Sequence, residues 1–229
     1  MKFVYPVKSG TENYIELLCA VRSVAKHYPD AEIVIISGTR PTWANNKVIH
    51  YTHHTKKGDK GAVDVWKKMM LFCRVFDGSF IHMNDDIFIM QPFDYEKYNL
   101  FNGNLEQRLD GLKAGNFYRE RVRFTISLLR GLRITTRNYD IHQPMMLTSS
   151  GLLWMAQHFN FDRYAYLYKS LHGAIVQMDA KEAVHCKLDN PDDVDEKMIY
   201  FSTSNAFTAK QEGKAKLLSL FSDKCRFEK

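Results

Sequence analysis

The segment from Phe80 to Pro92 constrains the fold of this chain more than any other. It places three polar residues, Asn84, Asp85 and Asp86, between two apolar runs. The apolar runs predict a buried central strand that stops at the proline. Two adjacent carboxylates are costly to bury without a partner, and each raises the pKa of the other. Mg²⁺ or Mn²⁺ would remove both penalties, because these cations prefer oxygen ligands. We therefore interpret the triplet as a metal site; the alternative is a strand that ends at Asn84, followed by a solvated turn.

Predicted strands and helices alternate around this segment. The first half predicts strands over residues 2–7, 31–37 and 47–51 and helices over 12–27 and 64–76. This order is typical of an α/β sheet whose strands are mostly parallel. Ligands of such sheets bind beyond the carboxyl ends of the strands, where the triplet would project. The second half predicts helices over 105–138, 152–168 and 210–221 and a strand over 198–201. Because we find no repeat and no linker, we expect one domain spanning residues 1–229.

Composition argues against several classes of protein. A hydrophobic content of 45% with 25% charged residues is ordinary for a globular chain and argues against disorder. No run approaches the roughly 20 apolar residues of a membrane span, and the first apolar run is too short for a signal peptide. The four cysteines are scattered without a Cys-x-x-Cys pair, which argues against structural zinc and a disulfide framework. We therefore expect a cytoplasmic protein with no membrane partner, and leave its oligomeric state open.

Positive charge is concentrated in one stretch. Residues 105–139 contain eight lysines and arginines against three acidic residues, an excess of five in a chain of net charge +6. If the stretch is one helix, several arginines lie close to a common stripe. Such a stripe suits a phosphate backbone, and the alternative is a solvated helix face. The residues that we predict to contact nucleic acid are Arg119, Arg123, Arg130 and Arg133.

A polar cluster follows at residues 139–144. In an extended segment Asp140 and His142 would point to the same side, because side chains alternate. A carboxylate beside an imidazole suits general-base chemistry. The alternative is a loop held by structural hydrogen bonds.

Taken together, these motifs resemble those of the GT-A glycosyltransferases. The resemblance is carried by the N-terminal strand, Val21-Arg22-Ser23-Val24, Ile36-Ser37-Gly38, Asn84-Asp85-Asp86, His142-Gln143-Pro144 and Phe201-Ser202-Thr203-Ser204. The chain is most similar to the small bacteriophage-type, DNA-modifying sugar transferases. Its triplet and His-x-Pro motif also resemble those of the Stealth-type capsule sugar-phosphate transferases.

The resemblance implies a Rossmann-like fold and a set of ligand-binding residues. It implies a nucleotide-sugar-binding half at residues 1–100 and an acceptor-binding half at residues 101–229. A Mn²⁺ or Mg²⁺ ion on the donor diphosphate would be held by Asp86 with Asp85, and His185 or His142 would complete the site. For the donor, expected to be a UDP-sugar, the implied contacts are Tyr5, Pro6, Arg22, Gly38, Lys67, Asn84 and Asp85. Asp140 would be the catalytic base of an inverting enzyme, and His142 a second catalytic or substrate-contacting residue.

The basic stretch and the phage-type resemblance together lead to a specific hypothesis. We expect transfer of a sugar to hydroxymethylated bases, such as hydroxymethylcytosine, of double-stranded phage DNA in the host cytoplasm. The base would leave the duplex stack to be reached. The first alternative is a GT-A or Stealth-type transferase that acts on a surface polysaccharide. The second is a non-catalytic DNA-binding protein whose triplet is only a turn.

Overall fold

A five-stranded mixed sheet forms the centre of the protein. The computed structural model describes residues 1–56, 61–95, 100–176, 179–183 and 187–229. The strand order is β3-β2-β1-β4-β7, and only β7 runs antiparallel to its neighbour. The strands are β1 (Lys2–Pro6), β2 (Glu32–Ser37), β3 (Ile49–Thr52), β4 (Ser79–His82) and β7 (Met145–Thr148). The predicted, mostly parallel α/β sheet is confirmed.

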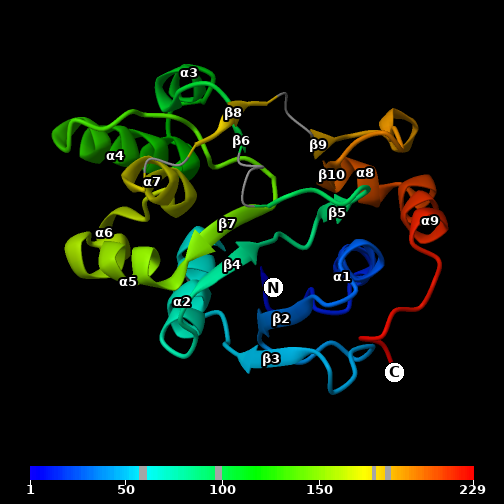
Figure 1. Cartoon of the computed structure of the whole chain (residues 1–229). Coiled ribbons are helices and arrows are strands. Elements are labelled where there is room, and N and C mark those ends of the chain that lie inside the picture. The colour runs from blue at the N-terminus through cyan, green and yellow to red at the C-terminus, as the bar shows by residue number, and fades with distance from the viewer. Residues whose placement is uncertain (57–60, 96–99, 177–178, 184–186) are drawn as a thin grey trace.

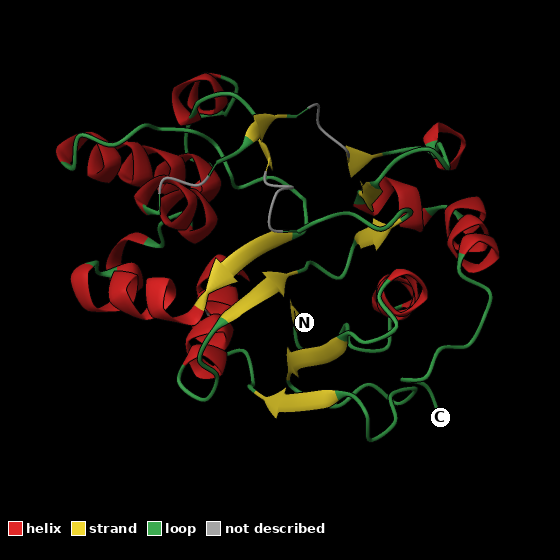
Figure 2. Ribbon diagram, viewed as in Figure 1, coloured by secondary structure: helices red, strands yellow, loops and turns green. Residues whose placement is uncertain are grey.

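Helices cover both faces of this sheet (Figures 1 and 2). Helix α1 (Ile15–His27) covers one face, and α2 (Gly61–Cys73) with α5 (Ser149–His158) covers the other. The alternation of side chains along β1 explains the two cores. Phe3 and Tyr5 pack on the α1 side, whereas Val4 packs on the α2 side. The apolar pattern of these strands therefore suits a sheet buried on both faces.

The Phe80–Pro92 segment forms two strands, not the single strand that its composition predicts. Strand β4 belongs to the central sheet, whereas β5 (Ile87–Ile89) pairs with β10 (Tyr200–Thr203) in a smaller sheet. That sheet also contains β9 (Lys187–Leu188). Both runs are apolar because both strands are buried, so hydrophobicity alone did not reveal the break between them.

Two predicted long helices are also divided. The basic stretch forms α3 (Leu105–Asp110) and α4 (Phe117–Gly131), and the next predicted helix forms α5 and α6 (Phe161–Tyr164). Arg133 has a φ of 59°, a left-handed conformation just beyond the end of α4. The arginines therefore do not form one continuous stripe. The remaining elements are β6 (Leu100–Phe101), α7 (Tyr168–Ile175), β8 (Lys181–Glu182), the short helix η1 (Pro191–Asp193), α8 (Asn205–Ala209) and α9 (Gln211–Leu220).

The described residues contain no helix that is both long enough and apolar enough to cross a membrane. Within the same residues, the thiols of Cys19, Cys73 and Cys225 are free. The fourth cysteine, Cys186, lies outside the described residues.

Candidate functional site

The Asn84-Asp85-Asp86 triplet forms the turn between β4 and β5. The backbone holds this turn at both ends: Met83 N–H donates to Val4 O at 2.9 Å, and Thr203 N–H donates to Asp86 O at 3.0 Å. The triplet therefore lies at the carboxyl end of β4, at the boundary between the central and the smaller sheet. As in the sequence-based alternative, it is a turn, but it is not fully solvated. The Asp86 side chain is only 18% exposed.

Asp86 lies between a histidine and a lysine. The Nδ1 atom of His142 lies 3.2 and 3.0 Å from its two carboxylate oxygens, and Lys187 Nζ lies 3.2 Å from one of them. Burial by itself would raise the pKa of Asp86, but the hydrogen bond with His142 and the charges of both neighbours outweigh it. The net effect is a lowered pKa, so Asp86 is an anion at neutral pH.

Asp85 has the opposite electrostatic environment. Burial raises its pKa to about 6, and the charges of Asp86 and Glu16 add to this increase. A like-charged neighbour within a few ångströms disfavours ionisation in this way. The charge of Lys187 lowers the pKa of Asp85 only in part, so the pair contains one stabilised carboxylate and one that is destabilised.

Two cavities meet at Asp85. The first, here called the His142 cavity, has a volume of about 560 Å³ and reaches from Pro6 and the triplet past Asp140 and His142 to α4 and α7. The second, here called the Glu16 cavity, has a volume of about 740 Å³ and lies between the start of α1 and helices α8 and α9. A ligand spanning both cavities would therefore pass directly over the carboxylate pair.

The inner wall of the His142 cavity contains buried ionisable groups that sequence reasoning missed. It includes Arg121 and Lys169, which are 9% and 5% exposed. His82, at the end of β4, is 2% exposed, and its Nε2 atom lies 2.7 Å from the hydroxyl oxygen of Tyr168. A lysine at the start of a helix usually indicates a solvated position, so the sequence contained no signal for Lys169.

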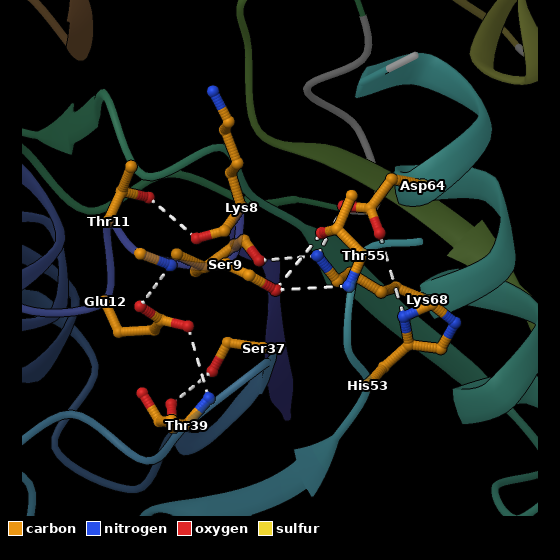
Figure 3. A network of polar contacts seen from close by, with 12 residues as sticks. Lys8, Ser9, Thr11, Glu12, Ser37, Thr39, His53, Thr55, Asp64 and Lys68 are labelled. Atoms are coloured by element: carbon orange, nitrogen blue, oxygen red, sulfur yellow. Dashed lines mark hydrogen bonds and ion pairs between the residues drawn. The ribbon is translucent and has the colours of Figure 1, made fainter. Parts of the chain in front are cut away.

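A polar network organises the loops beyond β1, β2 and β3 (Figure 3). The Thr55 N–H and hydroxyl both donate to Ser9 Oγ, at 3.3 and 3.1 Å. The buried Glu12 carboxylate accepts hydrogen bonds from Gly10 N–H and Thr39 N–H, at 2.7 and 3.2 Å. These bonds connect three loops next to the cavities, and the Lys8 side chain extends away from the network.

A buried ion pair fixes the start of α2 against β1. Lys68 Nζ lies 2.5 Å from Asp64 and donates to Val7 O at 2.7 Å. Both side chains are almost fully buried. Lys68 therefore has a structural role, which is to hold α2 against the end of β1.

Five of the predicted site residues lie around one cavity. They are Pro6, Asn84, Asp85, Asp140 and His142, which line the His142 cavity. Asp86 lines the Glu16 cavity next to it. Asp140 and His142 both line this cavity, although residues 141–143 form a bend and not the extended segment on which their common orientation was predicted. His185 lies outside the described residues.

The structure does not bring four other predicted donor residues to the cavities. Tyr5 is fully buried in the core, and its hydroxyl donates to Ala20 O. Arg22 forms a bidentate ion pair with Glu228. Gly38 packs against Ser9: a β-carbon there would lie 2.8 Å from Ser9 Oγ. Lys67 lines a separate cavity of about 990 Å³ between α2 and α5.

The predicted arginines differ in their surroundings. Arg119 donates to the carbonyl oxygens of Leu109 and Leu112, at 2.9 and 2.7 Å, and so holds α3 against α4. Arg123 and Arg130 are exposed but pair with Glu120 and Glu106. Arg133 is exposed beyond the end of α4. These surroundings leave Arg123, Arg130 and Arg133 on the surface and give Arg119 a structural role.

Known proteins resemble this chain in fold and not in sequence. No protein-family model matches the sequence, and no curated protein matches it significantly. Among solved structures, the galactosyltransferase LgtC in complex with donor and acceptor sugar analogues has a TM-score of 0.50 at 9% identity. The match covers 97% of this chain and 95% of that chain. The fold is that of the GT-A glycosyltransferases.

A second solved structure matches the chain at a lower score. It is a glycosyltransferase involved in the glycosylation of the major capsid of PBCV-1, with a TM-score of 0.42 at 7% identity. The match covers 95% of this chain and 98% of that chain. At 9% identity the match with LgtC establishes the GT-A fold alone.

The donor atoms of the triplet suit a divalent cation. Asp85 and Asp86 offer hard oxygen ligands, and a cation beside Asp85 would oppose the burial and like charges that raise its pKa. Within the described residues no group of three His, Cys, Asp or Glu side chains could hold a metal. The protein ligands available in this part of the chain are therefore the two carboxylates, with the remaining positions open to substrate oxygens and water.

Proposed function

We propose that the protein is a metal-dependent glycosyltransferase that moves a sugar from a nucleotide-sugar donor to a hydroxyl group. The observation that carries this proposal is the Asp85–Asp86 pair at the carboxyl end of β4, between two cavities of a GT-A fold. This is the edge at which open α/β sheets bind their ligands.

Charge development explains why the pair is useful. As the glycosidic bond breaks, the departing nucleoside diphosphate gains negative charge. A Mn²⁺ or Mg²⁺ ion held by Asp85 and Asp86 would supply Lewis-acid stabilisation of that charge. Lys187, 3.2 Å from Asp86, and Lys8, which lines both cavities, would add positive charge on the protein side. The donor nucleotide would then occupy the Glu16 cavity and the transferred sugar the His142 cavity.

Asp140 is our proposed base. It lines the His142 cavity with His142, and its backbone N–H donates to Asn138 Oδ1 and Ser170 Oγ, both at 3.1 Å. These bonds fix the backbone from which the carboxylate projects. A carboxylate there would accept the proton of the attacking hydroxyl in an inverting reaction. His142 would orient Asp86 and contact the substrate.

The decisive test is turnover of a panel of nucleotide sugars with Mn²⁺, with Mg²⁺ and with excess EDTA. We expect hydrolysis or transfer that requires the metal, with a UDP-sugar as the preferred donor. Binding of each nucleoside diphosphate would be measured in parallel by calorimetry. Failure of every nucleotide sugar to bind, in the presence of metal, would exclude the proposed activity.

For the acceptor we propose hydroxymethylated double-stranded DNA in a host cytoplasm. The support is the net charge of +6 and the exposed arginines at and beyond α4. Replacing Arg123, Arg130 and Arg133 together should weaken DNA binding and flatten its dependence on salt. The matched control replaces Lys26, Lys197 and Lys224, which are exposed elsewhere. DNA binding that is the same in both variants would favour the surface-polysaccharide acceptor instead.

A further inference from the structure

Lys169 is a buried cation with few protein partners. Its ammonium group donates one hydrogen bond, to Ile141 O at 2.5 Å, and the side chain forms no ion pair in the described part of the chain. An ammonium group has three donors, and leaving them unpaired in a buried site is unfavourable. Burial lowers the pKa of Lys169, although the charges of Asp140 and Asp86 partly offset this effect.

A second cation lies on the same wall. Arg121 uses two of its nitrogen atoms to donate to Ala165 O, at 2.7 Å, and to Tyr166 O, at 3.5 Å. Its guanidinium group lies 5.7 Å from the centre of the Tyr118 ring, and both residues line the His142 cavity. Guanidinium has five N–H donors, so these bonds leave donors for a ligand. The wall therefore presents two buried cations.

Among the described residues that line the cavity, one carboxylate remains to balance them, because Asp86, whose charge also acts on Lys169, is already paired with His142 and Lys187. The other carboxylates that line the cavity are Asp64, which is paired with Lys68, and Asp85, which belongs to the metal pair. Asp140 remains, which leaves the inner end with an excess of one positive charge. His82 adds to the polar wall, because its Nδ1 atom is buried and has no hydrogen-bond partner in the described structure.

We propose that the inner end of the His142 cavity binds the carboxylate of an acidic sugar, with Lys169 as the residue that determines this specificity. The carboxylate would complete the hydrogen bonds of the ammonium group and neutralise the excess charge. Charge-assisted hydrogen bonds to a buried carboxylate are strong and distinguish an acidic sugar from its neutral counterpart. This inference rests on the proposed function, because it names the sugar class that the site would accept.

A binding experiment tests the specificity without requiring turnover. D-Glucuronate and D-glucose would be titrated into the protein and followed by NMR. We expect wild type to bind glucuronate about tenfold or more tightly than glucose, and Lys169→Met to lose that preference. Lys26→Met, at an exposed position of α1, is the matched control and should retain it. Equal binding of the two sugars to wild type would overturn the proposal.

Stability measurements separate a specificity role from a structural one. If the charge of Lys169 serves the ligand, Lys169→Met should unfold at the same or a higher temperature, since a poorly paired buried cation is removed. A clearly lower unfolding temperature together with an unchanged preference for glucuronate would assign Lys169 to the core and reject our inference. The wild-type comparison remains decisive even if the variant does not fold.

Two further experiments are needed. The first shows whether the acidic sugar is the donor or the acceptor, and the second shows whether the proposed function or only the acidic-sugar subsite is wrong. A rate that is higher with UDP-glucuronate than with UDP-glucose assigns the subsite to the donor, whereas stimulation by glucuronate as acceptor assigns it to the acceptor. Calorimetry with UDP and Mn²⁺ tests the proposed function separately. Tight UDP binding without preference for glucuronate rejects the subsite alone.

Discussion

At the scale of single residues, Asp86 is the side chain on which the proposed chemistry depends most directly. Asp86→Asn removes the charge of the proposed metal ligand while keeping the shape of the side chain. We expect metal-dependent turnover to fall about 100-fold or more, the size of effect seen when one electrostatic group of a transition-state site is lost. Steady-state rates at saturating Mn²⁺ would measure it. Asp30→Asn, at an exposed position, should have the wild-type rate; equal rates in all three proteins would remove Asp86 from the mechanism.

The raised pKa of Asp85 predicts how the stability of the folded protein depends on pH. Its pKa is raised to about 6 in the folded protein by burial, Asp86 and Glu16, against an ordinary value of 3.8. Because the folded state holds the proton more tightly than the unfolded state, this group favours folding below pH 4. That contribution is lost as the pH rises through 6. Without metal, Asp85→Asn should therefore be more stable than wild type at pH 8, by about 3 kcal/mol at most, and the gap should close towards pH 4.

Urea unfolding in EDTA between pH 4 and pH 8 measures this difference. Adding Mn²⁺ should reverse the order at pH 8, because metal binding stabilises the form that has both carboxylates. A variant that is less stable than wild type at pH 8 without metal would show that the carboxylate of Asp85 already has sufficient positive charge beside it.

The sequence was informative at this scale where a residue's chemistry conflicts with its neighbours. Adjacent carboxylates within apolar runs indicated the Asp85–Asp86 pair, and alternation indicated that Asp140 and His142 share a side. Lys169 gave no such sign. Its environment is created by α4 and by residues 139–142, which are distant along the chain, and a helical lysine is compatible with any solvated position.

At the scale of elements, the contact between α8 and α9 determines one wall of the Glu16 cavity. Gly213 lies so close to α8 that a β-carbon would be 2.0 Å from the carbonyl oxygen of Phe207. Because this neighbour is backbone, it cannot move without shifting α8, which contributes Asn205 and Thr208 to the cavity. Gly213→Ala should lower the free energy of unfolding by about 2 kcal/mol and weaken nucleotide binding.

Gly131 provides the matched control for this change. It is the last residue of α4, and a β-carbon there would meet nothing within 4 Å. Gly131→Ala should therefore leave stability unchanged or raise it by up to about 1 kcal/mol. Chemical denaturation and UDP calorimetry of the two variants would measure both effects. Equal stability of the two variants would indicate that α8 and α9 separate easily.

Elements were predictable from the sequence where hydrophobic period and turn residues agree, as in β1, α1 and β2. They were not predictable where hydrogen bonds between distant segments determine where a strand ends. The chain breaks between β4 and β5 without glycine or proline, because Asp86 O and Thr203 N–H pair across the two segments. The long basic helix was the opposite case. Gly111 and Gly115, followed by the N-cap Asn116, gave a local signal for the division into α3 and α4, and the charge pattern obscured it.

At the scale of the whole molecule, the C-terminal segment closes the fold onto α1 and the loop before β3. The two carboxylate oxygens of Glu228 accept hydrogen bonds from Arg22, each at 2.8 Å, and the two side chains are 6% and 10% exposed. Arg22 also donates to Phe221 O, and Lys229 N–H donates to Trp43 O, at 2.8 and 2.9 Å. Residues separated by about 200 positions are thereby held together.

Removing one member of this pair should cost more than removing an exposed pair. Glu228→Gln leaves the Arg22 guanidinium buried without its counter-charge, and we expect a loss of about 3 kcal/mol in the free energy of unfolding. Glu32→Gln, which breaks the half-exposed pair with Lys2, should cost less than about 1 kcal/mol.

Burial would raise the pKa of Glu228, but the hydrogen bonds from Arg22 lower it overall. The contribution of Glu228 is therefore present at neutral pH and is lost as the pH falls through this lowered value. Urea unfolding at pH 7 and pH 3 would measure both effects: the gap between wild type and Glu228→Gln should narrow in acid, and a gap that is the same at both pH values would mean that shape, and not charge, holds the C-terminal segment in place.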